Sequence, residues 1–239
     1  MTLWRPYGAD GPTLSELAQQ AWSSTDRGYD LLAPRFDHTP FRTPDDVVAG
    51  ALALLGPAGN ERLQRGLDVC CGTGAGLAQL HGRCHHVVGL DRSAGMLLQA
   101  RTRVPDASLV RGDALAMPFV ATFDVACSFG AFGHIFVADE RRLVASVYAA
   151  LKPGGRFLFV TAESPPLLSK ARWMAHAFNA AMRVRNVVKQ PAFVMYYLTF
   201  LLPRATRLLA EAGFAVRTHP LTAGAGAGAR YVVVDAQKS

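Results

Sequence analysis

The chain has 239 residues, half of them hydrophobic, which is enough for one α/β domain with additions and a sizeable buried core. Charged residues, glycines and prolines interrupt the apolar runs well before the roughly 20 residues that span a bilayer, and the first residues lack the basic-then-apolar pattern of a signal peptide. Length and composition therefore argue against a transmembrane helix and predict a cytoplasmic protein.

The formal net charge is +7 and is unevenly distributed. Residues 1–162 carry 15 Lys and Arg against 15 Asp and Glu, whereas residues 163–239 carry 10 against 3. A basic surface of this kind can attract an acidic substrate, nucleic acid or an anionic membrane surface, and a solvated basic face without a partner fits the count equally well. Peripheral contact with an anionic membrane is therefore one open hypothesis.

Four cysteines stand at positions 70, 71, 84 and 127. A chain of this length does not depend on a disulfide framework. The run Cys84-His85-His86 has no second Cys or His pair at zinc-site spacing. We expect neither a disulfide nor a metal site.

The first 60 residues are expected to form a helical arm or lid ahead of the core. Apolar residues recur at helical spacing over 14–22. The run Thr43-Pro44-Asp45-Asp46 is typical of a helix start, and Thr43 is the expected N-cap of a helix over 47–55. Residues 29–37, between these helices, are expected to cover the core as a lid or by plain helix packing.

The stretch from Gly66 to Leu77 organises the chain. It predicts a strand over 66–70, a turn with alternating glycines at 72, 74 and 76, and a helix over 74–81. A glycine-rich turn at a helix start lets the backbone approach a ligand, because glycine has no Cβ and tolerates positive φ. The glycine spacing matches neither the G-x-G-x-x-G dinucleotide pattern nor a P-loop, which weakens both phosphate-binding alternatives.

A second acid ends the next predicted strand, which spans residues 86–91. Asp91 at the tip of that strand can accept hydrogen bonds from both hydroxyls of a ribose. Together with the glycine turn it predicts a nucleoside ligand with little or no phosphate. Ser93 is the expected cap of a helix that ends at Arg103.

Predicted strands and helices continue to alternate up to residue 162, and beyond it this strand–helix alternation stops. We expect strands over 107–110, 123–129 and 156–161, a helix over 139–151 and a turn at 152–155. Residues 163–205 are expected to form a cap insertion, in which an amphipathic basic helix ends before Pro191 and an aromatic run follows. The chain is completed by a helix over 203–212 and strands over 214–217 and 230–235, joined through a Gly-Ala loop at 223–228.

Five motifs follow one another along the chain: Asp68-Val-Cys-Cys-Gly-Thr-Gly-Ala-Gly76, Gly89-Leu-Asp91-Arg-Ser93-Ala-Gly-Met96-Leu97, Arg111-Gly-Asp113-Ala-Leu-Ala-Met-Pro118-Phe119, Phe123-Asp124-Val-Ala and Leu151-Lys-Pro-Gly-Gly155. In this order they resemble the class I S-adenosylmethionine (SAM)-dependent methyltransferases. The first two motifs, together with Leu201-Leu-Pro ahead of Ala212-Gly-Phe, most resemble the ubiquinone/menaquinone-biosynthesis type of that family. The resemblance implies an α/β fold in one domain over residues 1–239, with a doubly wound, Rossmann-like, seven-stranded and mainly parallel sheet, an antiparallel last strand and a helical cap.

The resemblance also implies SAM as the cofactor and S-adenosylhomocysteine (SAH) as the product. Asp68 would lie at the amino-acid half of SAM, Asp91 at the ribose and Asp113 at the adenine amino group, although Asp113 also fits a plain turn or cap residue. Arg42 is a candidate partner for the cofactor carboxylate. The complete set of implied cofactor-binding residues is Phe36, Arg42, Asp68, Cys70, Gly72, Gly74, Asp91, Arg92, Met96, Gly112, Asp113, Ala114 and Phe129.

Methyl transfer from a sulfonium is an in-line displacement that mainly requires alignment and exclusion of water. His134, just past the fourth predicted strand, is the candidate general base, and the alternative is a histidine packed beside the cofactor. Tyr196 and Tyr197 are candidates for the acceptor pocket.

These observations predict an enzyme that methylates a small apolar or amphipathic acceptor, such as a quinone precursor, a polyketide or a lipid. Two alternatives stay open. An RNA methyltransferase would explain the basic last third, but Ser128-Phe-Gly-Ala stands where an Asn/Asp-Pro-Pro-Tyr motif is typical, so we expect no stable nucleic-acid partner. A non-catalytic SAM-binding sensor or scaffold is the other. A monomer and a homodimer are equally consistent with the sequence.

Overall fold

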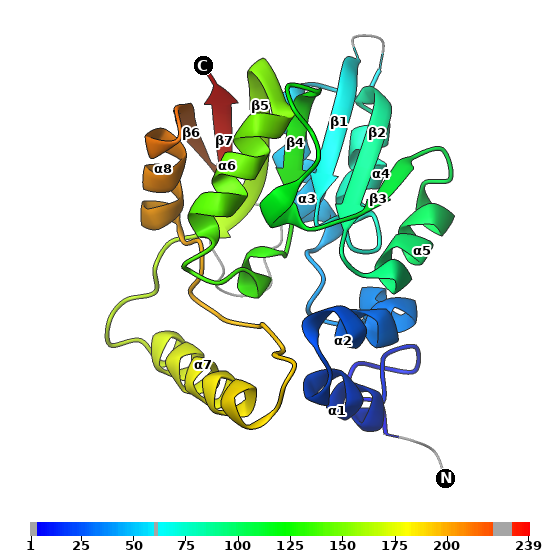
Figure 1. Ribbon diagram of the computed structural model, residues 1–239, viewed down its shortest axis with the longest axis vertical. Helices are drawn as coiled ribbons and strands as arrows, with labels where there is room; N and C mark the ends of the chain where they lie inside the picture. The colour runs from blue at the N-terminus through cyan, green and yellow to red at the C-terminus, as the bar shows by residue number, and fades with distance from the viewer. Residues whose placement is uncertain (1–3, 60–61, 222–230) are drawn as a thin grey trace.

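The computed structural model describes residues 4–59, 62–221 and 231–239. Within these residues, seven strands form one sheet in the order β3-β2-β1-β4-β5-β7-β6 (Figure 1). β7 is antiparallel to its neighbours β5 and β6, and the other neighbouring pairs are parallel, which confirms the predicted sheet. The strands are β1 (Leu63–Val69), β2 (Cys84–Asp91), β3 (Ser108–Arg111), β4 (Phe123–Ser128), β5 (Leu151–Ala162), β6 (Phe214–Leu221) and β7 (Tyr231–Lys238).

Helices cover both faces of the sheet, as expected for strands that are apolar on both sides. On one face, α3 (Asp45–Leu52), α4 (Ala75–His81) and α5 (Ala94–Arg103) contribute buried residues to one core cluster. On the other face, α6 (Glu140–Ala150) and α8 (Leu202–Glu211) contribute to a second cluster. This is the doubly wound arrangement that the sequence predicted.

Two predicted helix caps have different outcomes. Helix α3 begins at Asp45, and the first intrahelical bond runs from Val48 N–H to the Pro44 carbonyl, so Pro44 occupies the N-cap position. The prediction that Thr43 is the cap is therefore wrong, because its side chain lies one residue too early. Ser93, in contrast, accepts from the Met96 N–H at 3.0 Å and caps α5 as predicted.

The boundaries of the last strands also differ from the prediction. β5 starts at Leu151, which already pairs with Phe123, and the ladder then shifts register before Arg156 pairs with Val125. The predicted turn at 152–155 is thus an irregular part of the strand, with Gly154 at φ +77°. The predicted Gly-Ala loop at 223–228 and Arg230 lie outside the described residues.

The predicted arm and cap meet beyond the end of the sheet at which the β1 arrow points (Figure 1). Of the predicted arm over residues 1–60, α1 (Leu14–Trp22), α2 (Thr25–Leu32) and the 3-10 helix η1 (Ala33–His38) lie there, whereas α3 packs into the core; the cap contains α7 (Lys170–Val188). Arg185 of α7 donates to the carbonyl oxygens of Ala21 and Ser23 at 2.9 and 2.7 Å, which joins cap to arm. None of the described helices has the length and apolar character needed to cross a bilayer.

Helices α6 and α8 offer a test of a buried ion pair. Glu140 is 1% exposed, accepts from the Phe200 N–H at 3.0 Å and pairs with Arg204. Because Glu140→Ala leaves that N–H buried without an acceptor, we expect a loss of about 2 kcal/mol in the free energy of unfolding, measured by urea denaturation. Glu211→Ala removes an exposed pair with Arg141 between the same helices and should cost less than about 1 kcal/mol. Equal losses would contradict this account.

Candidate active site

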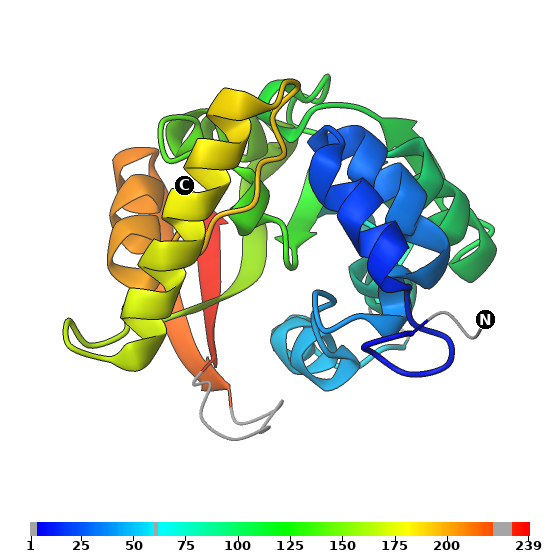
Figure 2. The ribbon, with the colours of Figure 1, turned by 90° about the horizontal axis from the view of Figure 1, so that it is seen from below.

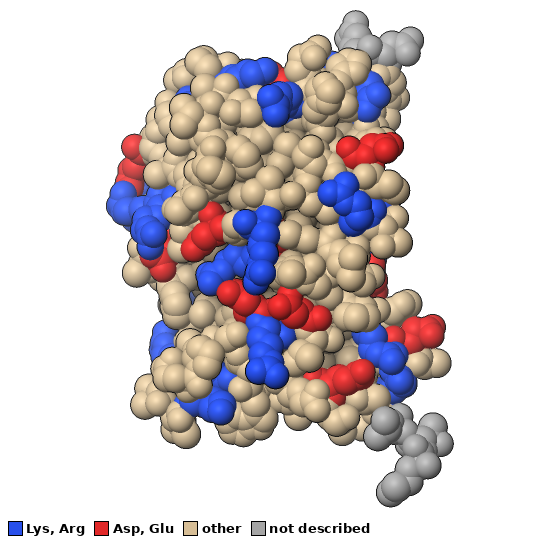
Figure 3. All heavy atoms as spheres, turned by 45° about the vertical axis from the view of Figure 1, so that its right-hand side comes forward, with Lys and Arg blue, Asp and Glu red and all other residues tan. Residues whose placement is uncertain are grey.

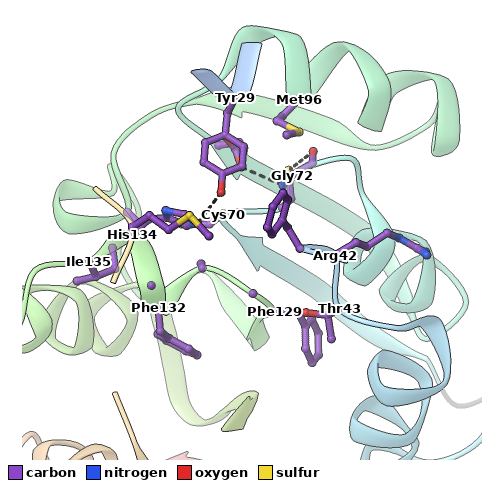
Figure 4. A pocket seen from close by; sticks show the side chains of 18 of the residues that line it. Tyr29, Arg42, Thr43, Cys70, Gly72, Met96, Phe129, Phe132, His134 and Ile135 are labelled. Carbon is purple, nitrogen blue, oxygen red and sulfur yellow. Dashed lines mark hydrogen bonds between the residues drawn. The ribbon is translucent and has the colours of Figure 1, made fainter. Parts of the chain in front are cut away.

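A pocket of about 720 Å³ lies at the carboxyl ends of the parallel strands, and residues of the arm and the cap contribute to its wall. Figure 4 shows some of the side chains that line it. Most of its lining comes from the arm, the turns after β1, β2 and β3, the segment after β4, and residues 194–199, and β5 and β7 add Val160, Thr161 and Tyr231. Residues 194–199 belong to the extended segment 189–201 between α7 and α8, which we call the strap. Ligands of open α/β sheets bind at this end of the strands.

Asp91, at the end of β2, holds the glycine turn in place. Its Oδ2 accepts from the Gly72 N–H and its Oδ1 from the Ser93 N–H, both at 2.9 Å. Gly72 has φ +52°, and nothing lies within 4 Å of the position a Cβ would occupy. The turn therefore presents bare backbone to the pocket, as the glycine pattern predicted. Burial raises the pKa of Asp91.

Asp68 lies beneath the same turn and is 2% exposed. Its Oδ1 accepts from the Cys127 thiol at 3.6 Å, whereas the buried Oδ2 has no hydrogen-bond partner among the described residues. A Cβ on Gly76 would lie 2.7 Å from that oxygen and 3.0 Å from the Phe129 ring, so a larger residue there would displace a neighbouring side chain. Burial raises the pKa of Asp68 to about 7. An unpaired buried carboxylate oxygen at a pocket wall is suited to a cationic group on a ligand.

Asp113, after β3, uses its two oxygens differently. Oδ1 accepts from the Leu115 N–H at 2.9 Å and caps the 3-10 helix η3 (Ala114–Ala116), which is the alternative role that the sequence left open. Oδ2 lies 3.9 Å from the guanidinium of Arg92, and the residue also lines the pocket. Arg92 donates in turn to Asp26 of the arm at 3.0 Å.

Two aspartates that the sequence analysis did not assign hold the arm on the core. Asp30 accepts from the Ser93 hydroxyl at 2.6 Å and from the Gly95 N–H at 2.9 Å, at the start of α5. Asp37 accepts from the hydroxyl of Thr73, inside the glycine turn, at 2.6 Å. One sequence signal could have found these two aspartates: an aromatic residue followed by an acid, Tyr29-Asp30, recurs seven residues later as Phe36-Asp37.

Tyr29 of the arm and His134, in the 3-10 helix η4 (Phe132–His134), meet in the pocket (Figure 4). The Tyr29 hydroxyl lies 2.7 Å from His134 Nε2, and the ring centroids are 4.9 Å apart. His134 Nδ1 lies 2.6 Å from the carbonyl oxygen of Val194 in the strap. A carbonyl only accepts, so Nδ1 carries the proton and Nε2 accepts from Tyr29. Burial lowers the pKa of His134 and raises that of Tyr29.

The structure brings most of the predicted site residues into this one pocket. Gly74 and Gly112 stand behind its wall, where Gly74 packs against the backbone of Ala100 and Gly112 donates to the Asp91 carbonyl at 3.0 Å. Arg42 lines the pocket, but its guanidinium pairs with two acids of the arm region and points away from Tyr29 and His134 (Figure 4). The other lining residues from the predicted set are Phe36, Asp68, Cys70, Gly72, Asp91, Arg92, Met96, Asp113, Ala114, Phe129 and His134.

Comparison with known proteins assigns the family. Residues 67–155 match a family described as a methyltransferase domain. The ubiquinone/menaquinone biosynthesis C-methyltransferase UbiE of Erwinia tasmaniensis is 32% identical over 186 residues, which cover 70% of this chain and 73% of that protein. The chain belongs to the class I SAM-dependent methyltransferases. This membership confirms the predicted enzyme class and the predicted cofactor.

Two further comparisons agree with this assignment. An uncharacterized methyltransferase of Synechocystis is 34% identical over 133 residues, which cover 50% of this chain and 63% of that protein, so the match spans less than two thirds of its length. Among solved structures, the DhpI–SAH complex has a TM-score of 0.65 at 19% identity and covers 92% of this chain and 98% of its own. That likeness confirms the predicted Rossmann-like fold of this methyltransferase.

The raised pKa of Asp68 predicts a pH-dependent effect of Asp68→Asn. Because the folded-state pKa of about 7 exceeds the usual value of about 4, folding takes up a proton between these values, and the ligand-free wild type loses stability as the pH rises through that window. The variant cannot ionise, so its free energy of unfolding relative to wild type should rise by on the order of 1 kcal/mol per pH unit. Urea unfolding across this range measures it.

Asp106→Asn, at an exposed turn residue, is the control for the replacement of an aspartate by asparagine. If the difference in the free energy of unfolding between Asp68→Asn and the wild type stays constant with pH, the pKa of Asp68 is not raised in the fold.

Proposed function

We propose that this methyltransferase transfers the methyl group of SAM to a small apolar or amphipathic acceptor of the quinone, polyketide or lipid type. The composition of the pocket wall carries the proposal. Charged lining residues come mainly from the arm and the turns after β1, β2 and β3, whereas the segment after β4 and the strap contribute aromatic and aliphatic side chains. A pocket with an apolar part and a few placed polar groups suits such an acceptor. The apolar wall residues are Phe132, Ile135, Phe136, Val194, Met195, Tyr196, Tyr197 and Leu198.

The charged part of the pocket fits SAM. Asp68 Oδ2 is an unpaired acceptor suited to the ammonium of the amino-acid half, and Asp91 and Asp113, which line the same pocket, would accept from the ribose and from the adenine amino group. The bare backbone at Gly72 allows close approach. When bound, SAM supplies an already activated methyl carbon. The protein then has to hold the acceptor in line with that carbon and exclude water.

His134 and Tyr29 form the proton-accepting group of this proposal. The Tyr29 hydroxyl donates to His134 Nε2 and keeps its own oxygen lone pairs free for an acceptor that donates a proton. As the acceptor proton passes to the Tyr29 oxygen, the Tyr29 proton passes to Nε2, and the imidazolium is stabilised through Nδ1–H by the Val194 carbonyl. This assigns the predicted general base His134 an indirect role through Tyr29.

The remaining parts of the proposal concern partners and surroundings. We propose a small-molecule acceptor, a single domain with its arm and cap, and a cytoplasmic location. The UbiE protein of Erwinia, named for ubiquinone and menaquinone biosynthesis, supports a quinone-like acceptor. RNA methylation and a non-catalytic role as a SAM-binding sensor are the alternatives that the following experiment separates.

An acceptor screen with radiolabelled SAM tests the function. We expect methyl transfer to a hydroquinone with an isoprenoid tail or to an apolar phenol, and none to a hydrophilic amine such as phosphoethanolamine, because the strap side of the pocket is apolar. Methylation of the hydrophilic amine alone would contradict the proposal. A steeply salt-dependent association with RNA would favour the RNA alternative. Tight SAH binding without turnover of any acceptor would favour the sensor.

Tyr29→Phe tests the proton transfer. The variant keeps the ring but loses the oxygen that links the acceptor to His134, so kcat should fall by about 10²-fold or more while the SAH dissociation constant changes by less than about threefold. The rate of the wild type should fall at low pH with an apparent pKa below the usual 6.5 of histidine. Tyr197→Phe, in the same pocket, is the control and should keep its rate. Unchanged kcat in Tyr29→Phe would overturn this role.

A further inference from the structure

The side of helix α7 that faces the protein carries two asparagines, Asn179 and Asn186, beside the half-buried Phe178 and Met182. Asn179 is 8% exposed and pairs with both backbone groups of Tyr197, donating to its carbonyl at 2.9 Å and accepting from its N–H at 2.8 Å. Asn186, two turns later on the same side, pairs in the same way with Phe193, at 3.0 Å in both directions. These four hydrogen bonds hold the strap against α7 and fix which side of the helix faces inward.

The opposite side of α7 is apolar and faces solvent. Seen from below, α7 crosses in front of the strands β6 and β7, and the helices of the arm lie beside it (Figure 2). Several exposed apolar side chains of this size on one side of a helix mark an interaction site, because such side chains are normally buried. Its large side chains are between 61% and 91% exposed and comprise Leu167 and Leu168 just before the helix and Trp173, Met174, Val184, Val187 and Val188 on it.

The charge around this surface has one sign. Residues 164–210 contain no Asp or Glu and seven cations, namely Lys170, Arg172, Arg183, Arg185, Lys189, Arg204 and Arg207. Within the described part of the chain, none of the five cations on α7 and at its end takes part in an ion pair. The face that includes α2 and α5 differs, since acidic and basic side chains lie next to one another there (Figure 3).

We propose that α7 and the preceding Leu167 and Leu168 dock this protein on an anionic lipid surface. Exposed apolar side chains enter the boundary between headgroups and acyl chains, and flanking cations such as Lys170, Arg183 and Lys189 contact anionic headgroups. A second copy of the chain fits the same surface poorly. In a two-fold dimer the surface meets itself, so cations would face cations with no acid in the segment to pair with them.

Docking through α7 would place the pocket next to the membrane. The strap is bonded to the inner side of α7, and its residues 194–199 line the pocket. The surface itself does not depend on which acceptor is methylated, so this inference stands apart from the proposed function.

Sedimentation with lipid vesicles tests the inference on the full chain. We expect binding to phosphatidylcholine vesicles that contain about 30 mol% phosphatidylglycerol, weaker binding to phosphatidylcholine alone, and weaker binding at high salt. Trp173→Ser with Val187→Ser should weaken the partition at least tenfold, and Arg183→Ala about fivefold. Leu98→Ser, which removes an apolar side chain 65% exposed on α5, is the matched control and should leave binding unchanged.

SAH binding by calorimetry and light scattering complete the experiment. The α7 residues changed here do not line the pocket, so the double variant should keep the SAH affinity of the wild type, which shows that it is folded. Failure to bind anionic vesicles with SAH binding intact would overturn the docking proposal and leave the proposed function untouched. If the wild type is a dimer in solution and the double variant is a monomer, the docking proposal is overturned in favour of self-association.

Discussion

The site depends on one carboxylate, that of Asp91. Its two oxygens bind the N–H of Gly72 in the turn after β1 and the N–H of Ser93 at the start of α5. Hydrogen bonds to a charged acceptor contribute about 1.5–3 kcal/mol each, so this residue holds two neighbouring strand ends in a fixed relation. With the turn fixed, bare backbone faces the pocket. Ser93, the N-cap of α5, then donates its hydroxyl hydrogen bond to Asp30 of the arm.

That last bond connects the core to the proposed proton-accepting group, Tyr29 and His134. Asp30 ties α2 to the start of α5, and Tyr29, its neighbour in the chain, then reaches His134 after β4. The imidazole is oriented from the other side by the carbonyl of Val194 in the strap. Arm, core and cap therefore each contribute one group to a single hydrogen-bonded chain, and displacement of any one of them would change the tautomer or the position of His134.

The sequence predicted those features that depend on neighbours along the chain. The glycine turn, the strand tips with Asp68 and Asp91 and the Ser93 cap are local patterns, and the structure places them as expected. Prediction failed where a contact joins distant residues, such as the bond from Tyr29 to His134, 105 positions apart. The prediction also failed at Thr43. The sequence pattern allows either Thr43 or Pro44 as the N-cap of α3, and only the hydrogen bond from the Val48 N–H to the Pro44 carbonyl decides between them.

The orientation of α7 shows most clearly why helix periodicity alone is insufficient. The sequence defines an apolar side and a polar side, and hydration would turn the polar side outward. Four hydrogen bonds from two asparagines contribute about 1 kcal/mol each, a sum similar to what burial of two large apolar side chains would contribute. The inner side also holds the half-buried Phe178 and Met182, but the outward side still leaves five large apolar side chains in water, and an apolar medium against α7 would bury them.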